Sequence, residues 1–382
     1  MSKNRIFWLG TVIVVFFGLY LWLSDFFAES KPEPVIKPVE EEEVIVEPET
    51  EIILLAVGDI MLARKVERLM SEYGREYPFL EVESRLNQAD LTFGNLECAV
   101  STRGTPLPGK GIWLRANPEV MPQLKECGFD VLSIANNHSL DYDAEAFLDT
   151  LKWLREFNIA PVGGGEDIIA SRTPFITTVN DIRIGFLAYT EMADMFWSYD
   201  YPRKLKATES QPGVAPFEYD IIIEDVKSLK EQVDLLVLSL HWGTEYSLSP
   251  TEIQRQQARG LVDAGADVII GHHPHVVQGV EIYNKGIIAY SLGNFIFDQN
   301  WSQHTREGLV MEIKLKSSGI SEVKLLPVII RESQPRFEQE EWAKKLADSV
   351  CQYSSALGTR CLISENPLEV ILITDGEYKQ QD

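Results

Sequence analysis

The sequence predicts an α/β fold for the body of the chain, which begins near residue 52. Continuous apolar runs of strand length alternate with segments whose apolar residues recur at helical spacing. This alternation is typical of β-sheets that are covered by helices on both faces. The composition of the 382-residue chain, 45% apolar and 24% charged, is that of a globular protein large enough to bury a sizeable core.

The apolar runs predict the strands in order along the chain. The first, 51–59, ends at Gly58-Asp59, and the second, 89–97, ends at a polar turn. Further strands are expected at 129–138, 182–190, 233–243, 266–273 and 286–295. The runs at 308–316 and 321–330 are predicted to pair as a hairpin.

Helices are predicted between these runs from capping signals and apolar spacing. Asn117-Pro118 predicts a helix start, with Asn as the cap, and that helix is expected to end near Gly128. A second helix follows 129–138, with one apolar face. That face consists of Ala144, Phe147, Leu148, Leu151 and Leu154. Ser249–Glu252 is interpreted as a capping box that opens a helix to about Asp263. Residues 340–382 are expected to add a helix and a short strand.

The N-terminal segment predicts a membrane anchor. Lys3 and Arg5 precede an uncharged apolar run, 6–23, whose helical length of about 27 Å approaches a bilayer core. Basic residues before the span predict an inside N-terminus and a translocated body. A cleaved signal peptide is the alternative, but the run exceeds the usual apolar length and lacks an A-x-A site. We therefore expect a single-pass protein of the cell membrane with its body outside the cytoplasm.

Four segments are predicted. Residues 1–28 form a cytoplasmic stub and anchor, and 29–51 form an acidic linker rich in Pro and Glu, which is expected to be extended. Residues 52–335 form the main domain and 336–382 a C-terminal extension. The net charge is −23, of which residues 1–51 carry −6, from four Lys or Arg and ten Asp or Glu, leaving −17 on the remainder. This acidity, without a Lys/Arg cluster, argues against a nucleic-acid partner.

The four cysteines do not have metal-type spacing. Cys98, Cys127, Cys351 and Cys361 contain no C-x-x-C pair. In an exported domain, Cys351 and Cys361 could close a short loop, although the sequence does not determine the pairing.

Metal-binding residue types gather at the ends of five predicted strands. In open α/β sheets, ligands bind outside the carboxyl ends of the strands, so these side chains are expected to converge. Imidazole, carboxylate and amide groups are ligands for Zn, Mn or Fe. "VIIGHHPHVVQG" alone supplies half of the six histidines. The whole set is Asp59; Asn95 and Glu97; Asn136, Asn137 and His138; His241; and His272, His273 and His275.

Each of these signals also has a simpler interpretation when it is taken alone. Asp59 is compatible with a turn or helix cap, the Asn136–His138 segment with an Asx-type turn, and His241 with a core histidine. Trp242, Glu245 and Asn294 lie beside the candidate ligands in sequence. Glu245 is interpreted either as a carboxylate that orients an imidazole or as a structural contact.

Six motifs in order resemble the CapA family of poly-γ-glutamate capsule biosynthesis proteins, which is related to the calcineurin-like metallophosphoesterases. They are "VGDIML", "GNLE", "IANNHSLDYD", "LHWGTEY", "GHHPH" and "YSLGNFIFD", and the resemblance covers about residues 52–300. It implies a metallophosphatase-like sandwich of two mixed β-sheets flanked by helices, with a two-metal site at one edge.

The resemblance also implies residue roles. Asp59 would bind the first metal, Glu97 would take the bridging position, and Asn137 would bind the second metal. His241 and either His272 or His273 would complete the ligands of the second metal, and His275 would bind the first metal. His138 would be the general acid or transition-state donor, and Asn95, Asn136, Trp242, Glu245 and Asn294 would support ligands or contact substrate.

The sequence departs from that pattern at two positions. Met61 stands where a metal-binding histidine is usual, and Glu97 replaces the bridging Asp. The first metal is therefore expected to bind weakly, to be absent or to have its coordination completed by water. The sequence thus allows either one or two divalent ions.

Three functions are compatible with these features. The first is a metal-dependent hydrolase that cleaves phosphate esters, or amide bonds of a surface polymer, with metal-activated water. The second is a non-catalytic component that binds or exports an anionic polymer such as poly-γ-glutamate, together with membrane synthase subunits. The third is a surface protein in which the metal only stabilises the fold. Neutral imidazole ligands predict that metal-dependent activity falls below about pH 6.

Overall fold

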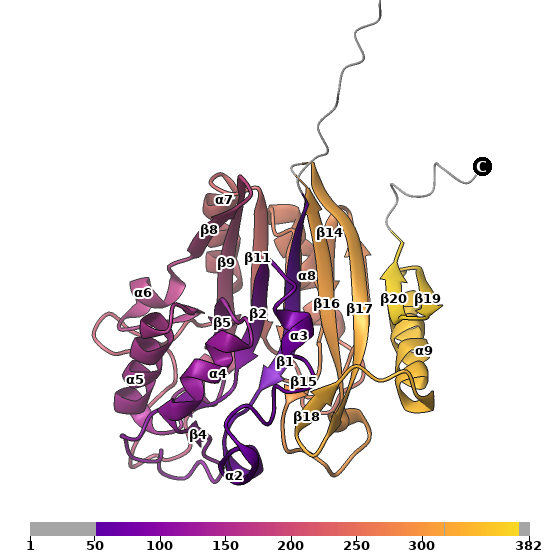
Figure 1. Ribbon diagram of the computed structural model, residues 1–382. Coiled ribbons are helices and arrows are strands. Elements are labelled where there is room, and N and C mark those ends of the chain that lie inside the picture. The colour runs from indigo at the N-terminus through magenta and orange to yellow at the C-terminus, as the bar shows by residue number, and fades with distance from the viewer. Residues whose placement is uncertain (1–50, 317, 374–382) are drawn as a thin grey trace, which may run out of the picture. The chain divides into compact units, whose positions relative to one another are not determined.

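Two mixed β-sheets pack face to face in the computed structural model, which describes residues 51–316 and 318–373 (Figure 1). The larger sheet contains, in spatial order, β19 (Cys361–Glu365), β20 (Leu368–Leu372), β17 (Gly319–Arg331), β16 (Glu307–Lys316), β1 (Ile52–Ile60), β2 (Leu91–Leu96), β5 (Val131–Ser133) and β6 (Ala160–Val162). In the same sheet, β15 (Asn294–Ile296) pairs with β1 and β18 (Gln334–Arg336) with β17.

The second sheet has six strands, of which the central ones are parallel. Its spatial order is β13 (Val280–Tyr283), β14 (Gly286–Ala289), β12 (Val268–His272), β11 (Leu235–His241), β9 (Ile182–Thr190) and β8 (Phe175–Val179). Two short ribbons pair β3 (Ala99–Val100) with β4 (Arg115–Ala116) and β7 (Gly164–Gly165) with β10 (Gly213–Val214). The predicted α/β class with two mixed sheets is confirmed.

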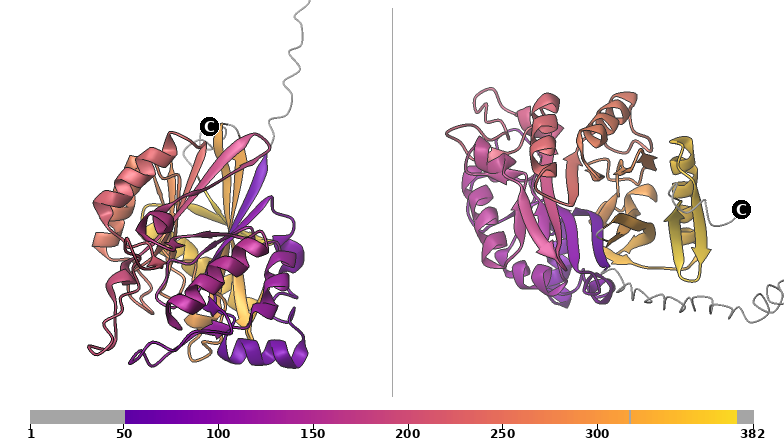
Figure 2. Two further views of the ribbon diagram at one scale, coloured as in Figure 1. Left: turned by 90° about the vertical axis from the view of Figure 1, so that its left-hand side faces the viewer. Right: turned by 90° about the horizontal axis from the view of Figure 1, so that it is seen from above.

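Helices cover both outer faces of the sandwich (Figure 2). The larger sheet packs against α2 (Arg64–Tyr73), α3 (Glu83–Leu86), α4 (Met121–Glu126) and α5 (Asp143–Glu156). The six-stranded sheet packs against α7 (Tyr219–Lys230) and α8 (Glu252–Ala264). The remaining helices are α6 (Ile168–Arg172), α9 (Glu341–Ala356) and the short 3₁₀ turns Pro118–Val120, Glu191–Asp194 and His304–Arg306.

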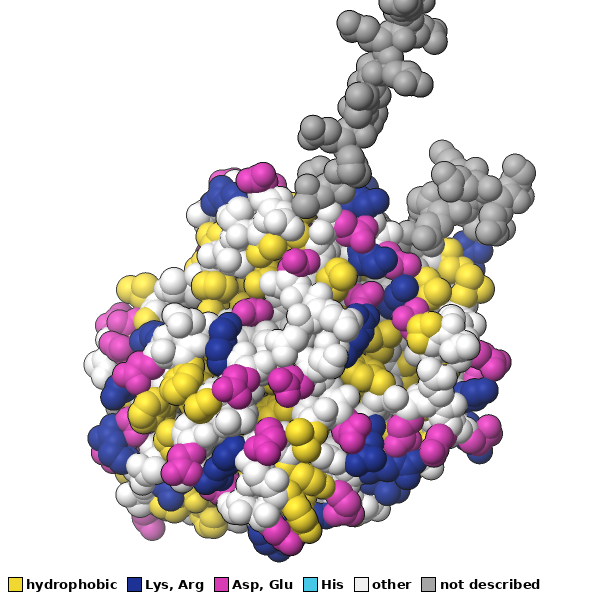
Figure 3. Space-filling model, in the orientation of Figure 1, with side chains coloured by type: hydrophobic (Ala, Val, Ile, Leu, Met, Phe, Trp, Pro, Cys, Tyr) yellow, Lys and Arg dark blue, Asp and Glu magenta, His cyan; other side chains and the backbone are white. Residues whose placement is uncertain are grey.

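The core between the sheets is built from the inward faces of their central strands. Phe93 of β2 stacks on Phe186 of β9 with ring centroids 5.9 Å apart, and both side chains are fully buried. Leu54 of β1 and Val237 of β11 belong to the same buried cluster. Burying an aromatic or aliphatic side chain of this size contributes about 1.5–3 kcal/mol. The outer surface is mixed in charge, and acidic and basic side chains alternate over the face in Figure 3.

The structure corrects four details of the expected elements. The predicted strand 286–295 divides into β14 and β15, which belong to different sheets, because the chain turns at Gly293 with a φ of 70°. The cap of α8 is Thr251, whose hydroxyl accepts from the Gln254 amide, rather than Ser249. The strand expected at 129–138 is limited to β5, and Leu148 is 37% exposed, off the buried face of α5.

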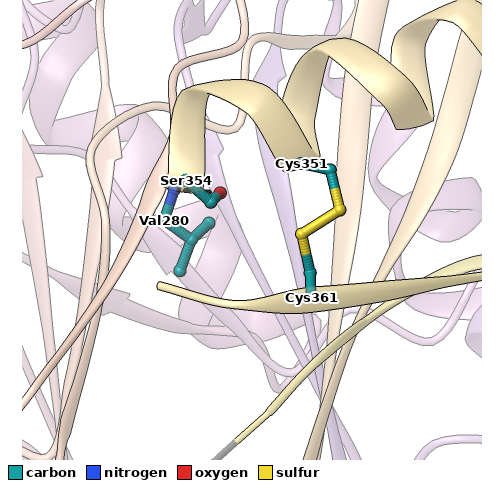
Figure 4. The surroundings of a disulfide bond; sticks show 4 residues. All are labelled: Val280, Cys351, Ser354 and Cys361. Atoms are coloured by element: carbon teal, nitrogen blue, oxygen red, sulfur yellow. Dashed lines mark hydrogen bonds between the residues drawn. A yellow bond between two sulfur atoms is a disulfide. The ribbon is translucent and has the colours of Figure 1, made fainter. Parts of the chain in front are cut away.

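The C-terminal segment joins both sheets. A disulfide links Cys351 of α9 to Cys361 of β19, with Cα atoms 5.9 Å apart (Figure 4). Strand β20 pairs with β17 of the larger sheet, and the Ser354 hydroxyl accepts a hydrogen bond from the Val280 amide of β13 in the other sheet. This segment contains the expected helix, but it has two strands instead of the one short strand that was expected.

The predicted membrane span at 6–23 and nearly all of the linker at 29–51 lie outside the described residues. Within the described part of the chain, the helices are too short or too polar to traverse a bilayer.

Candidate metal centre

The carboxyl ends of β1, β2, β11 and β12 bring the predicted ligands together. Asp59 lies opposite Asn95 in the β1–β2 register, and His241 lies opposite His272 in the β11–β12 register. Each of these residues is the last or the last but one of a parallel strand, so all four lie at one edge of the sandwich. Glu97 follows β2 directly. In Figure 1 this edge is the lower end of the molecule, where β1 passes into the loop before α2.

Asp59, Glu97 and His275 form the tightest group. Among the described residues, these three each offer a ligand atom within 4.8 Å of the other two. His275 Nδ1 lies 3.3 Å from Asp59 Oδ2, and His275 Nε2 lies 3.7 Å from Glu97 Oε1. All three side chains are buried, with exposed fractions of at most 3%. This group could hold a divalent cation.

Hydrogen bonding supports a cation at this position. Neither carboxylate oxygen of Glu97 has a hydrogen-bond partner within the described chain, and the same holds for Nε2 of His272 and for Nδ1 of His273. Buried polar atoms left without partners are costly, by about 1–3 kcal/mol each and more for a charged group. A cation would satisfy these donor atoms, so the residues fit a metal.

In the absence of a cation, protons balance the charges of this group. Burial and the negative charge of Asp59 raise the pKa of Glu97 well above its usual range. Burial would also raise the pKa of Asp59, but its contacts with His272 and His275 outweigh burial and hold it well below. Burial would lower the pKa of His275, but Glu97 and Asp59 raise it to about 9. A cation entering this group would therefore displace protons.

A second set of ligands lies beside the first. His241 Nε2 is 3.0 Å from Asn137 Oδ1, and the rings of His241 and His273 are 4.8 Å apart. His272 instead places Nδ1 3.2 Å from Asp59 Oδ1. Burial lowers the pKa of His241 well below its usual value and that of His273 to about 4, so both imidazoles are neutral at pH 7. Neutral imidazole is the form that binds metals.

Three asparagines hold the ligands in place. Asn95 donates to Asp59 Oδ1 at 2.9 Å, and Asn136 donates to Asn95 Oδ1 at 3.1 Å. Asn294 Oδ1 lies 3.0 Å from His275 Nδ1, which leaves Nε2 of that ring directed toward Glu97. Hydrogen bonds of this kind fix the tautomer and orientation of a metal-binding imidazole.

The backbone is strained at two of the histidines. His273 and His275 have φ values of 96° and 57°, in the left-handed region that non-glycine residues rarely adopt. Such conformations cost about 1–3 kcal/mol each and cluster at functional sites. The strain lets one short segment direct its imidazoles toward different neighbours.

His138 is fixed by a carboxylate that the sequence analysis did not single out. Asp141 Oδ2 lies 2.7 Å from His138 Nδ1, and Asp141 Oδ1 accepts from the buried Lys110 ammonium. Burial lowers the pKa of His138 despite the nearby carboxylate. The spacing His-x-x-Asp within "NNHSLD" could have revealed Asp141, but nothing in the glycine-flanked "PGKG" marks Lys110.

Two predicted neighbours differ in their relation to the ligands: the Trp242 side chain lies in the core, whereas the negative charge of Glu245 contributes to the raised pKa values of Glu97 and His275. Trp242 is fully buried and stacks on Tyr290 with ring centroids 6.1 Å apart, in the core beneath the helices. Glu245 is exposed, next to Tyr246, whose ring lies 6.2 Å from that of His275. Met61 is buried in the hydrophobic core, where its sulfur accepts from the Ala63 amide.

Comparison with known proteins gives one family. The family model described as bacterial capsule synthesis protein PGA_cap matches residues 53–299. Capsule biosynthesis protein CapA of Bacillus anthracis is 36% identical over 287 residues, which cover 73% of this chain and 68% of the relative. PGA biosynthesis protein CapA of Bacillus subtilis is 36% identical over 281 residues, covering 73% and 72%.

Solved structures show weaker similarity. A phosphatase from Mycoplasma pneumoniae has a TM-score of 0.43 at 13% identity, covering 78% of this chain and 99% of its own. A protein described as a 5'-nucleotidase from Staphylococcus aureus has a TM-score of 0.47 at 16% identity, covering 78% and 58%. Both scores are too low to support an inference about activity.

Proposed function

The chain belongs to the PGA_cap family of bacterial capsule synthesis proteins, and we propose that it is a metal-dependent hydrolase acting in the synthesis of a poly-γ-glutamate capsule. The substrate would be an amide bond of the polymer or a phosphate ester. The body would lie outside the cytoplasm, held by the apolar segment at 6–23, with the anionic polymer and membrane synthase subunits as partners.

One observation carries the proposal. Glu97 is fully buried, and both of its carboxylate oxygens lack a hydrogen-bond partner in the described residues, although Asp59 and His275 lie beside it. A site that only stabilised the fold would be better served by an apolar residue, because a buried carboxyl group whose oxygens make no hydrogen bond is costly. This arrangement is expected of side chains that bind a cation.

The protein's own residues would hold the cation and move the proton. Asp59, Glu97 and His275 would bind one ion, and His241, His273 and Asn137 offer donors for a second. A bound divalent ion would supply Lewis-acid polarisation of a carbonyl or phosphoryl oxygen and lower the pKa of an attacking water. His138 donates its Nδ1 proton to Asp141, so that its Nε2 is free to accept a proton and return it to the leaving group.

The test combines metal binding with cleavage. Full-length protein is treated with chelator, titrated with Mn²⁺, and then assayed on poly-γ-glutamate for new amino groups and on a generic phosphate ester. We expect Mn²⁺-dependent cleavage of one substrate and a loss of about 10²–10⁴-fold in His138→Ala. Bound Mn²⁺ without cleavage of either substrate, and unchanged polymer output in His138→Ala, would favour the non-catalytic polymer-binding function instead.

A further inference from the structure

We propose that Lys110 is a positioning residue that holds the turn carrying Asn137 and His138 against the candidate metal centre. Lys110 lies in the loop between β3 and β4, about 27 residues before that turn in sequence. The inference rests on the proposed function, since Lys110 is assigned a role only toward that centre.

Lys110 contacts both parts of the turn. Its Nζ donates to the main-chain carbonyl of Asn137 and to Asp141 Oδ1, and it lies 3.5 Å from His138 Nδ1. The Lys110 side chain is 4% exposed and that of Asp141 is fully buried. A buried ammonium is tolerated only when it is paired and hydrogen-bonded, and breaking such a pair is strongly destabilising. The ion pair therefore constrains the turn more than an exposed pair would.

The turn transmits this constraint to the centre. Asn137, whose carbonyl Lys110 binds, places Oδ1 3.0 Å from His241 Nε2. Asp141, whose carboxylate Lys110 binds, places its other oxygen 2.7 Å from His138 Nδ1. One ammonium thus fixes a candidate ligand through its main chain and the candidate proton carrier through its carboxylate partner.

The loop that delivers Lys110 is docked closely on its neighbours. A Cβ added to Gly104 would lie 2.2 Å from the Tyr142 carbonyl oxygen, and one added to Gly109 would lie 2.6 Å from the Trp197 carbonyl oxygen. The Trp197 ring covers the Lys110 ammonium, with Nζ 4.5 Å from the ring centroid. The Leu114 amide donates to Asp141 Oδ2 at 2.6 Å, so the same loop binds the carboxylate twice.

A matched control is available in the same domain. Lys125 forms a comparable pair with Asp130, with Nζ 2.9 Å from Oδ1, but its side chain is 39% exposed and none of its hydrogen bonds reaches a candidate ligand. Lys125→Met removes a Lys–Asp pair without touching the turn at 136–141.

The experiment measures the turn and the metal separately in the full-length protein. Lys110→Met and Lys125→Met are compared with the unchanged protein by hydrogen exchange without metal and by calorimetric titration with Mn²⁺. In Lys110→Met we expect faster exchange of the amides at 136–141 and an Mn²⁺ affinity lower by about tenfold, as for other residues that support metal ligands. Lys125→Met should change neither quantity.

A second variant covers the case in which Lys110→Met unfolds because Asp141 is left unpaired. Lys110→Met/Asp141→Asn removes both charges and should fold with the same two defects. The inference is overturned if either folded variant binds Mn²⁺ within twofold of the unchanged protein. If the unsubstituted protein binds no Mn²⁺, the proposed function fails as well. If it binds Mn²⁺ and the variants bind Mn²⁺ more weakly, the result supports both the inference and the proposed function.

Discussion

Two buried glutamates stand in contrasting surroundings. Glu281 of β13 accepts from Arg259 Nε at 2.8 Å and from the Tyr290 hydroxyl at 2.6 Å, so both of its oxygens are satisfied. Glu97, equally buried, has no hydrogen bond to either oxygen in the described residues. The first region also carries the disulfide-linked C-terminal segment, whose Ser354 binds the neighbouring Val280 amide.

The contrast separates stability from function within one domain. The Glu281 region shows that this fold provides partners for a buried carboxylate where the carboxylate is structural. The absence of such partners at Glu97 within the described chain is therefore the stronger reason to place a ligand there. Substitutions at Glu97 should weaken metal binding with little loss of stability, whereas substitutions in the Glu281 region should lower stability and leave metal binding unchanged.

The largest effect is expected for Glu97→Gln. Loss of a buried charge that faces a cation should weaken Mn²⁺ binding by about 3–5 kcal/mol, which is a factor of a hundred to several thousand. The metal-free protein should melt at nearly the same temperature, because the raised pKa of Glu97 already favours its neutral form and a neutral amide replaces it. Calorimetric titration and thermal melting check both quantities. Unchanged Mn²⁺ affinity would remove Glu97 from the centre.

Removal of the disulfide should lower the stability of the Glu281 region without affecting the metal centre. In the chain-entropy description, closing the ten-residue separation between Cys351 and Cys361 stabilises the fold by about 3 kcal/mol. Cys351→Ser/Cys361→Ser should therefore lower the melting temperature and leave Mn²⁺ affinity unchanged. A loss of metal affinity in this variant would show that the two regions are coupled.

The pH dependence of stability should also report on the metal centre. His275 has a folded-state pKa of about 9 against an ordinary 6.5, and the pKa of Glu97 is also raised. Groups with raised pKa values stabilise the fold at low pH and lose that contribution as pH rises. Metal-free protein should thus lose about 3 kcal/mol between pH 6.5 and 9. Melts with chelator measure this loss, which Mn²⁺ should reduce and Glu97→Gln should make shallower.

The smallest effect is expected for Glu281→Gln. The hydrogen bonds from Arg259 and Tyr290 would lose their charged acceptor, at a cost of about 1–2 kcal/mol in the free energy of unfolding. Denaturant unfolding measures this cost. Mn²⁺ affinity should stay within twofold, and a large change would mean that Glu281 also acts on the centre.

Much of the architecture follows from local patterns in the sequence. Strands 51–59 and 182–190 were expected within one residue of their observed ends, because buried central strands have uninterrupted apolar runs. The division of 286–295 into two strands was not predictable, since a single left-handed glycine transfers the chain between sheets. The order of the strands within each sheet depends on pairings between strands that are distant in sequence, and the hydrophobic periodicity of the sequence does not encode these pairings.

The candidate centre was predictable in composition but not in its partnerships. Residues at strand ends, such as Asp59 and His241, could be grouped because parallel strands end at a common edge. Lys110 could not, because its contact with Asp141 depends on how a loop of irregular conformation is docked. The assignment of His273 to the neighbourhood of His241, and of His272 to that of Asp59, likewise required the backbone geometry.

The left-handed backbone of the "HHPH" segment has a consequence for sequence change. His272 faces Asp59, His273 faces His241 and His275 faces Glu97, so four consecutive positions serve three separate contacts. A residue inserted or deleted within the segment would move at least one of these rings away from its contact, because the three contacts are fixed relative to one another. The length of this segment is therefore constrained together with the identity of its histidines.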